Sequence, residues 1–150
     1  MSEKELITDF LSSKVFALAG VSNNKDKFGN YIYDELIKKE IKTYPINQNL
    51  TEYKGVKCYH TLDSLPEKVD PLICSVKPDA VLNLLENAHK NQIKKVWLQQ
   101  GSESKEAIDF CKQHNINVIS KRCLMMFVSD DSFPHNLHKF FSKVFGKYPK

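Results

Sequence analysis

The stretch KVFALAG, residues 14–20, decides the fold that the sequence predicts. Residues 15–19 are all apolar, which indicates a strand buried on both faces, and Gly20 ends it. Four further short runs of this kind occur, at 43–46, 72–76, 96–98 and 117–119.

Amphipathic helical patterns lie between these runs, at 30–40, 79–91 and 103–114, and another covers 4–11. Buried strands that alternate with helices are typical of a parallel sheet covered on both faces. The sequence therefore predicts an α/β, Rossmann-like doubly wound fold with a mainly parallel five-stranded sheet. Residues 47–66 depart from the alternation and predict an elaborated edge connection, with a small strand at 56–59 and a one-turn helix at 61–65.

Composition predicts one domain over 1–150, because 41% of the residues are hydrophobic and 27% charged. Residues 1–13 form its N-terminal helix. Residues 127–150 form a basic amphipathic extension, with Leu137, Phe140, Phe141, Val144 and Phe145 on one helical face. We expect a cytoplasmic protein with reduced thiols, because neither a membrane span nor a signal peptide is evident and its four cysteines form no CxxC pair.

The charge is concentrated at one end. Net charge is +4, but the last 16 residues carry four lysines and no acid, and without them basic and acidic residues balance at 18 each. General nucleic-acid binding needs a broad positive surface, so we do not expect it.

Candidate binding residues follow the strands, because ligands of parallel sheets collect beyond the carboxyl ends of the strands. The loop from Gly20 to Asn30 opens a helix, whose amino terminus favours a phosphate, and Lys25 and Lys27 add positive charge. The spacing is not GxGxxG, so an ordinary strand-to-helix turn with solvated lysines stays open. Asn47 stands where NAD-binding domains carry an acid.

Other candidates at the same edge are Gln99 and Gln100, which suit an amide-rich ligand. The alternative is a plain strand end with Ser102 as a helix cap. Cys123 lies beside Lys121 and Arg122, whose charges favour a thiolate. We hypothesise that it forms a mixed disulfide with a thiol ligand, against the alternative of a structural thiol.

Several motifs together resemble a known family. They are KFGN at 27–30, YPIN at 44–47, GVKCY at 55–59, WLQQGS at 97–102 and RCLM at 122–125. In this order they resemble the small single-domain coenzyme A-binding proteins, whose fold is similar to the CoA-binding domain of the succinyl-CoA synthetase alpha subunit. The likeness covers about 13–126, but Asn47-Gln48 replaces the Asn-Pro usual in that family.

The resemblance implies a role for each matching segment. The loop that approaches the CoA diphosphate in that family matches Gly20, Val21 and Ser22, and the helix entry beside it matches Lys27, Phe28, Gly29 and Asn30. The position after the second strand, near the adenosine half, matches Asn47. Two further walls follow the third and fourth strands; the first matches Val76, Lys77 and Pro78, and the second matches Gln99 and Gly101.

The function that we expect is noncatalytic binding or sensing of CoA or a short acyl-CoA. No Ser-His-Asp order, acid pair or metal signature supplies chemistry, and His135 and His138 lack a third ligand. Two alternatives remain: an NAD(P)-binding Rossmann oxidoreductase, and an interaction protein acting through its basic C-terminal helix. That helix also allows a homodimer contact.

Overall fold

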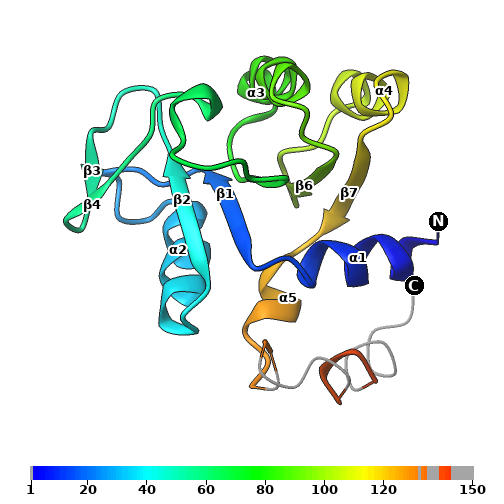
Figure 1. The fold of residues 1–150 in the computed structure, drawn as a ribbon, viewed down its shortest axis with the longest axis horizontal. Helices are drawn as coiled ribbons and strands as arrows, with labels where there is room; N and C mark the ends of the chain where they lie inside the picture. Colours follow the sequence, from blue (N-terminus) through cyan, green and yellow to red (C-terminus); the bar gives the residue numbers. More distant parts are fainter. Residues whose placement is uncertain (1, 132, 135–138, 143–150) are drawn as a thin grey trace.

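The fold is built on five parallel strands, seen in a computed structural model that describes residues 2–131, 133–134 and 139–142. In spatial order they are β2 (Lys42–Ile46), β1 (Val15–Ala19), β5 (Pro71–Cys74), β6 (Lys95–Gln99) and β7 (Asn117–Arg122) (Figure 1). The winding reverses at β1, because β2 lies on one side of it and β5 on the other.

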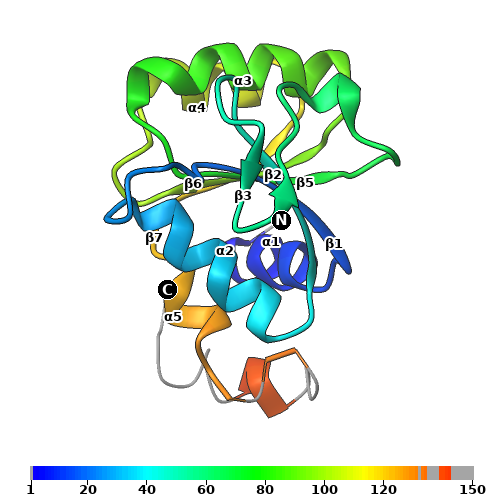
Figure 2. The ribbon, with the colours of Figure 1, turned by 90° about the vertical axis from the view of Figure 1, so that its left-hand side faces the viewer.

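Helices cover both faces of the sheet, as Figure 2 shows. On one face lie α3 (Pro78–Lys90) and α4 (Lys105–Gln113). On the other lie α1 (Glu3–Leu11), α2 (Phe28–Lys38) and α5 (Met125–Val128). The predicted α/β Rossmann-like fold is confirmed, with helix ends shifted by at most two residues and α5 unpredicted.

Alternate residues of β1 supply the core on each face. Phe16 and Leu18 pack in the cluster beneath α1, α2 and α5, whereas Ala17 and Ala19 pack beneath α3 and α4. All four are at most 3% exposed, so the apolar run at 15–19 is explained by burial from both sides. Trp97 of β6 lies in the same cluster as Phe16.

The connection after β2 folds back along the edge of the sheet. It contains an antiparallel hairpin of β3 (Glu52–Tyr53) and β4 (Val56–Lys57), followed by the 3-10 helix η1 (Leu62–Ser64). Tyr59 donates its N–H to the carbonyl of Pro45 and accepts from the N–H of Asn47, which fixes the return path. The expected small strand at 56–59 is present but ends two residues earlier, at Lys57. The expected one-turn helix at 61–65 is present and is one residue shorter at each end. The partner strand β3 was not predicted.

Of the residues after α5, Phe133 and Phe140 pack on the face that carries α1 and α2. Phe133 and Phe140 are 2% and 0% exposed within the same hydrophobic cluster. Lys39, at the end of α2, donates to the carbonyls of Asp130 and Phe133. Most of the predicted basic helix, including Leu137, Val144 and Phe145, lies outside the described residues.

Candidate functional site

A close backbone contact forms the crevice where the winding reverses. Gly20 follows β1 with φ +145°, and a Cβ there would lie 2.6 Å from the carbonyl oxygen of Ser75. A Cβ on Gly29 would lie 2.3 Å from the carbonyl oxygen of Gly20. Real Cβ contacts are essentially never this short, so the first turn of α2 packs directly on the loop only because residue 29 is glycine, and the loop packs on Ser75 only because residue 20 is glycine.

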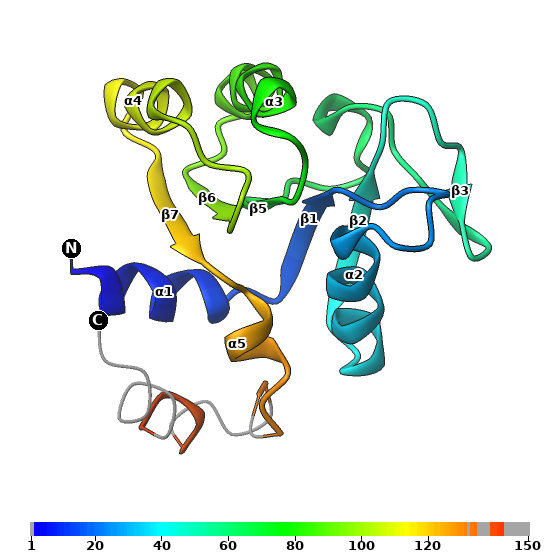
Figure 3. The same ribbon diagram turned by 180° about the vertical axis from the view of Figure 1, so that it is seen from behind.

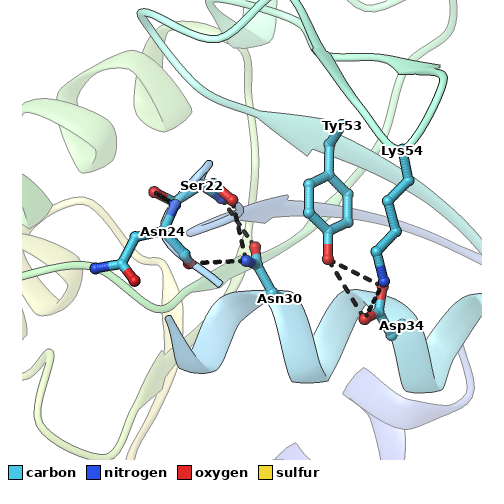
Figure 4. Close-up of polar contacts among 6 residues, drawn as sticks. All are labelled: Ser22, Asn24, Asn30, Asp34, Tyr53 and Lys54. Atoms are coloured by element: carbon cyan, nitrogen blue, oxygen red, sulfur yellow. Dashed lines mark hydrogen bonds and ion pairs between the residues drawn. The ribbon is translucent and has the colours of Figure 1, made fainter. Parts of the chain in front are cut away.

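The side chain of Asn30 holds the loop that follows Gly20 (Figure 4). Its Oδ1 accepts the N–H of Ser22 at 2.9 Å, and its Nδ2 donates to the carbonyls of Ser22 and Asn24 at 3.0 and 3.1 Å. Asn30 is 5% exposed. It therefore shapes the loop from below, and it does not line the larger pocket described next.

Replacing Asn30 with aspartate is expected to lower the free energy of unfolding by about 2 kcal/mol, because a buried carboxylate would face two carbonyl oxygens without a donor. Those carbonyls and burial would raise the pKa of the new carboxyl in the folded state, so the loss should grow as pH rises and shrink in acid. Urea unfolding at neutral pH and in acid measures this difference in the free energy of unfolding. In the control Asn24→Asp the oxygen that accepts from the N–H of Asp26 is retained. Equal stability of the two variants would contradict the role of Asn30.

Asn47 ties the loop after β2 to the loop after β1. Its Nδ2 donates to the carbonyl of Val21 at 2.7 Å, and its Oδ1 accepts the N–H groups of Asn49 and Leu50, both at 2.8 Å. An uncharged amide thus occupies the position at which an acid would bind ribose hydroxyls.

The main pocket opens beside these loops and has a volume of about 690 Å³. Its floor is the segment 19–22. One wall is a side of α3 that runs from Asp79 to Lys90, and the other is formed by residues 46–49 with His60 and Thr61. Ser75, Val76 and Lys77 join the floor to α3. The pocket therefore lies at the switch point of the sheet, where parallel α/β folds bind ligands.

The pocket carries more positive than negative charge. Lys27, Lys77 and Lys90 line it, as do the carboxylates of Asp79 and Glu86. Within the described ranges none of the three lysines belongs to an ion pair, since the pairs found there involve other residues. Three ammonium groups are thus available to an anionic ligand.

Among the four longer helices, α1 to α4, capping differs between those that reach the pocket and those that do not. Helices α1 and α4 begin at Ser2 and Ser104, whose hydroxyls accept N–H groups of the first turn. Helices α2 and α3 begin instead at Lys27 and Lys77, with no side-chain cap. A cation at a helix amino terminus is unfavourable, so the two helices that reach the pocket leave N–H groups and positive charge unsatisfied by the protein's own side chains.

Seven of the residues proposed from the sequence line this pocket. They are Gly20, Val21, Ser22, Lys27, Asn47, Val76 and Lys77. Gly29 supports Gly20 from beneath, and Pro78 is the first residue of α3. Phe28 is 41% exposed, with its ring 6.1 Å from that of Tyr31.

Lys25 and Asn30 line a second, smaller pocket of about 380 Å³, on the side of the loop that faces α2 and the hairpin. Figure 3 shows the β3 strand beyond the edge of the sheet, near the start of α2. The hairpin is held there by Asp34, which accepts from the hydroxyl of Tyr53 at 3.2 Å and pairs with Lys54 at 2.9 Å (Figure 4). The structure thus separates Lys25 from Lys27.

Gln99, Gly101 and Cys123 do not line either pocket. Gln99 is 4% exposed, its Oε1 accepts the N–H of Leu124 at 2.9 Å, and its Nε2 donates to the sulfur of Cys123 at 3.2 Å. The side chain of Gln99 therefore stabilises the turn after β7. Contact of Gln99, Gly101 and Cys123 with a ligand stays a prediction.

Ser102 is not the cap of α4, because Ser104 has that place. The hydroxyl of Ser102 donates to the carbonyl of Val76 at 2.6 Å and accepts the N–H of Val76 at 3.1 Å. It therefore fixes the segment that carries Val76 into the main pocket.

The four cysteines are free and differ in exposure. Burial raises the pKa of Cys111 to about 12, and the pKa values of Cys58 and Cys74 are raised for the same reason. Cys123 is half-buried.

Brief iodoacetamide treatment of the native protein is therefore expected to modify Cys123 first, because only an accessible thiolate reacts. Peptide mass spectrometry before and after denaturation measures the order. Equal labelling of Cys58 or Cys74 would contradict the burial. The mixed disulfide of Cys123 with CoA stays a prediction; the same method with CoA disulfide and the Cys123→Ser variant tests it.

Several pocket residues were not predicted from the sequence. Thr61 and His60 come from the edge connection, and Asn83, Asn87 and Lys90 come from α3. The helical pattern carries a weak signal, because Asn83, Asn87 and Lys90 recur at three to four residues beside the buried stripe of Val81 and Leu85. No such signal brings residues 60–61 to this helix.

The described parts of the chain contain neither a candidate metal cluster nor a candidate membrane-spanning helix. There, no three histidine, cysteine, aspartate or glutamate side chains lie close enough to bind a metal ion. Over the same residues, no helix has both the length and the apolar composition that a bilayer crossing requires.

Known proteins are similar to this chain in sequence. The profile of the family described as "CoA binding domain" matches residues 14–129. The ADP-forming acetate–CoA ligase of Methanocaldococcus jannaschii is 27% identical over 140 residues, covering 88% of this chain and 19% of the ligase. The alpha subunit of ADP-forming acetate–CoA ligase II from Pyrococcus furiosus is 25% identical, covering 77% and 28%. This chain thus spans only 19% and 28% of the length of these two relatives.

Solved structures of similar size also match. A conserved hypothetical protein from Pyrococcus furiosus is 34% identical, with a TM-score of 0.71 over 75% of this chain and 97% of its own. A hypothetical protein from Pyrococcus horikoshii is 26% identical, with a TM-score of 0.76 over 83% and 88%. A Thermus thermophilus protein is 26% identical, with a TM-score of 0.74 over 94% and 99%.

Proposed function

The chain belongs to the CoA binding domain family and is homologous to part of the ADP-forming acetate–CoA ligases, and from this premise we propose that it binds CoA or a short acyl-CoA in the main pocket without catalysing a reaction. Binding or sensing of the cofactor is then its role. The cytoplasmic location expected from the sequence belongs to the same proposal.

The observation that carries the proposal is the pair of lysine N-caps in one pocket. Lys27 and Lys77 place two ammonium groups and the open amino termini of α2 and α3 around the segment 19–22. Each helix terminus stabilises an anion by about 0.3–2 kcal/mol. CoA carries a diphosphate and a ribose phosphate, so it satisfies several of these groups at once.

The backbone also fits a diphosphate. Glycine at positions 20 and 29 keeps the loop free of Cβ atoms where α2 begins, and Asn30 fixes the carbonyls of Ser22 and Asn24 on the far side of the loop. A phosphate approaching from the pocket would then meet N–H groups, the arrangement that helix amino termini offer to anions.

Thermal unfolding with CoA, NAD and NADP at equal concentration tests the proposal. CoA at one hundred times its Kd is expected to add about 2.7 kcal/mol, which corresponds to a rise in Tm of about 5–10 °C for a chain of this length. NAD and NADP are expected to leave Tm unchanged. A melt that responds to NADP but not to CoA would favour the oxidoreductase instead.

The interaction-protein alternative depends on the basic helix predicted near the C-terminus, whose residues Lys143, Lys147 and Lys150 lie outside the described residues. Truncation after Asp131 separates the two ideas. Because Phe133 and Phe140 are buried in the core cluster, we expect truncation to lower stability. Loss of partner capture with unchanged stability would favour the interaction role.

A further inference from the structure

The smaller pocket, of about 380 Å³, is formed by three segments that are far apart in the sequence. They are the loop 22–25, helix α2, and the hairpin of β3 and β4. Figure 4 shows Tyr53 pointing from the hairpin toward α2, with Ser22 and Asn24 of the loop on the other side of Asn30. Small-molecule sites have volumes of about 300–1,000 Å³, so this pocket is large enough for a small ligand.

The charges of this pocket are balanced, unlike those of the main pocket. Two cations and two anions line it. Asp34 and Lys54 pair with each other at 2.9 Å, and Asp34 also accepts from the hydroxyl of Tyr53. The remaining two are Lys25 of the loop and Glu52 of the hairpin, neither of which has an ion-pair partner among the residues that the structure describes. Two different walls thus present one ammonium and one carboxylate group, which suits a zwitterion.

Two tyrosine rings supply the apolar part of the lining. Tyr53 is 8% exposed, and it is held by the bond to Asp34 and by an edge-to-face contact with Tyr33 at 5.5 Å. Tyr31 is 57% exposed, so most of its ring surface is left for an occupant of the pocket to cover. Aromatic rings contribute large apolar contact areas, so this pair suits an apolar or aromatic group.

We propose that the smaller pocket binds a free amino acid with a large apolar side chain, and that its occupancy strengthens CoA binding in the main pocket. The carboxylate of the amino acid lies toward Lys25 and its ammonium group toward Glu52. Its side chain lies between the rings of Tyr31 and Tyr53. The effect on CoA rests on the proposed function, whereas the amino-acid site does not.

The two pockets share the loop that separates them. Ser22 lines both, and Asn30, which lines only the smaller one, holds the N–H and the carbonyl of Ser22 at 2.9 and 3.0 Å. A ligand packed against this side favours the loop conformation that also forms the floor of the main pocket. CoA affinity therefore rises, and by linkage CoA raises the affinity for the amino acid by the same factor.

Calorimetric titration without CoA tests the amino-acid site. L-phenylalanine or L-leucine is expected to bind with a Kd of about 1 mM or tighter. Phenylacetate lacks the ammonium group and phenethylamine lacks the carboxylate, so each should bind about tenfold more weakly than L-phenylalanine, or weaker still. Absence of binding by both amino acids, or equal binding of either fragment, would overturn the inference.

Charge-neutralising variants test where the amino acid lies. Lys25→Gln and Glu52→Gln should each weaken its binding by about tenfold or more. Lys38→Gln and Glu40→Gln make the same changes at exposed positions outside both pockets, and they should leave its affinity unchanged. Far-UV circular dichroism and Tm confirm that all four variants fold. Wild-type affinity in Glu52→Gln would overturn the placement.

Titration of CoA with and without a saturating concentration of the tighter-binding amino acid tests the coupling. The Kd of CoA is expected to fall by about fivefold or more. Glu52→Gln should bind CoA alone normally and lose the enhancement. Amino-acid binding with unchanged or weakened CoA affinity would overturn the coupling. Amino-acid binding by a protein that does not bind CoA would instead contradict the proposed function and leave the second site in place.

Discussion

Alanine at position 29 is expected to destabilise the domain by about 3 kcal/mol and to weaken CoA binding at least tenfold. The added Cβ would lie 2.3 Å from the carbonyl oxygen and 2.5 Å from the carbonyl carbon of Gly20. Both are backbone atoms, and Gly29 is buried, so relief requires moving α2 away from β1. The loop that holds the proposed diphosphate would move with it.

The sign of this effect is informative because Gly29 lies in the first turn of a helix. Helix propensity alone favours alanine over glycine by about 1 kcal/mol, so without the close contact the variant would be more stable than the wild type. Urea unfolding measures the difference. Tyr31→Ala, in the same turn at a side chain 57% exposed, serves as the control and should change stability little. A stabilised Gly29→Ala variant would contradict the close packing of loop and helix.

Serine in place of Lys27 or Lys77 is expected to change stability and binding in opposite directions. Serine would cap the helix, which adds about 0.5–1 kcal/mol to the free energy of unfolding of the free protein. The same change removes an ammonium group from the pocket, so CoA affinity should fall about tenfold for each lysine and more for the pair. Urea unfolding without ligand and calorimetric titration with CoA measure the two effects.

Lys38→Ser is the matched control for these variants, because Lys38 lies in the last turn of α2, away from the pocket. A cation is favourable at that end of a helix, so the control should be slightly less stable and bind CoA normally. Wild-type affinity in both Lys27→Ser and Lys77→Ser would contradict the proposal that the two helix termini hold the phosphates.

The layout of the sheet was predictable because the three central strands β1, β5 and β6 are buried from both sides. The run at 15–19 is apolar throughout since Phe16 and Leu18 face one helical layer and Ala17 and Ala19 face the other. Two short elements escaped prediction. Helix α5 has four residues and β3 has two, which is too short for any hydrophobic period to show.

The site was predictable only where it depends on the ends of strands. Gly20, Ser22 and Lys77 follow β1 and β5, so topology alone puts them at the switch point. The backbone contacts of Asn30 and Gln99 were not predicted, because a buried amide that bonds to backbone groups cannot be distinguished in a sequence from one that faces a ligand. The part of the main pocket between α3 and residues 60–61 was not predicted, because residues 60–61 reach α3 only through the long connection after β2.

A crystal structure of the protein grown with excess CoA tests the central claim most directly. We predict the diphosphate within hydrogen-bonding distance of N–H groups at the start of α2, between Gly20 and Lys77. Density for CoA at another surface, or a pocket in which side chains exclude the cofactor, would contradict the account.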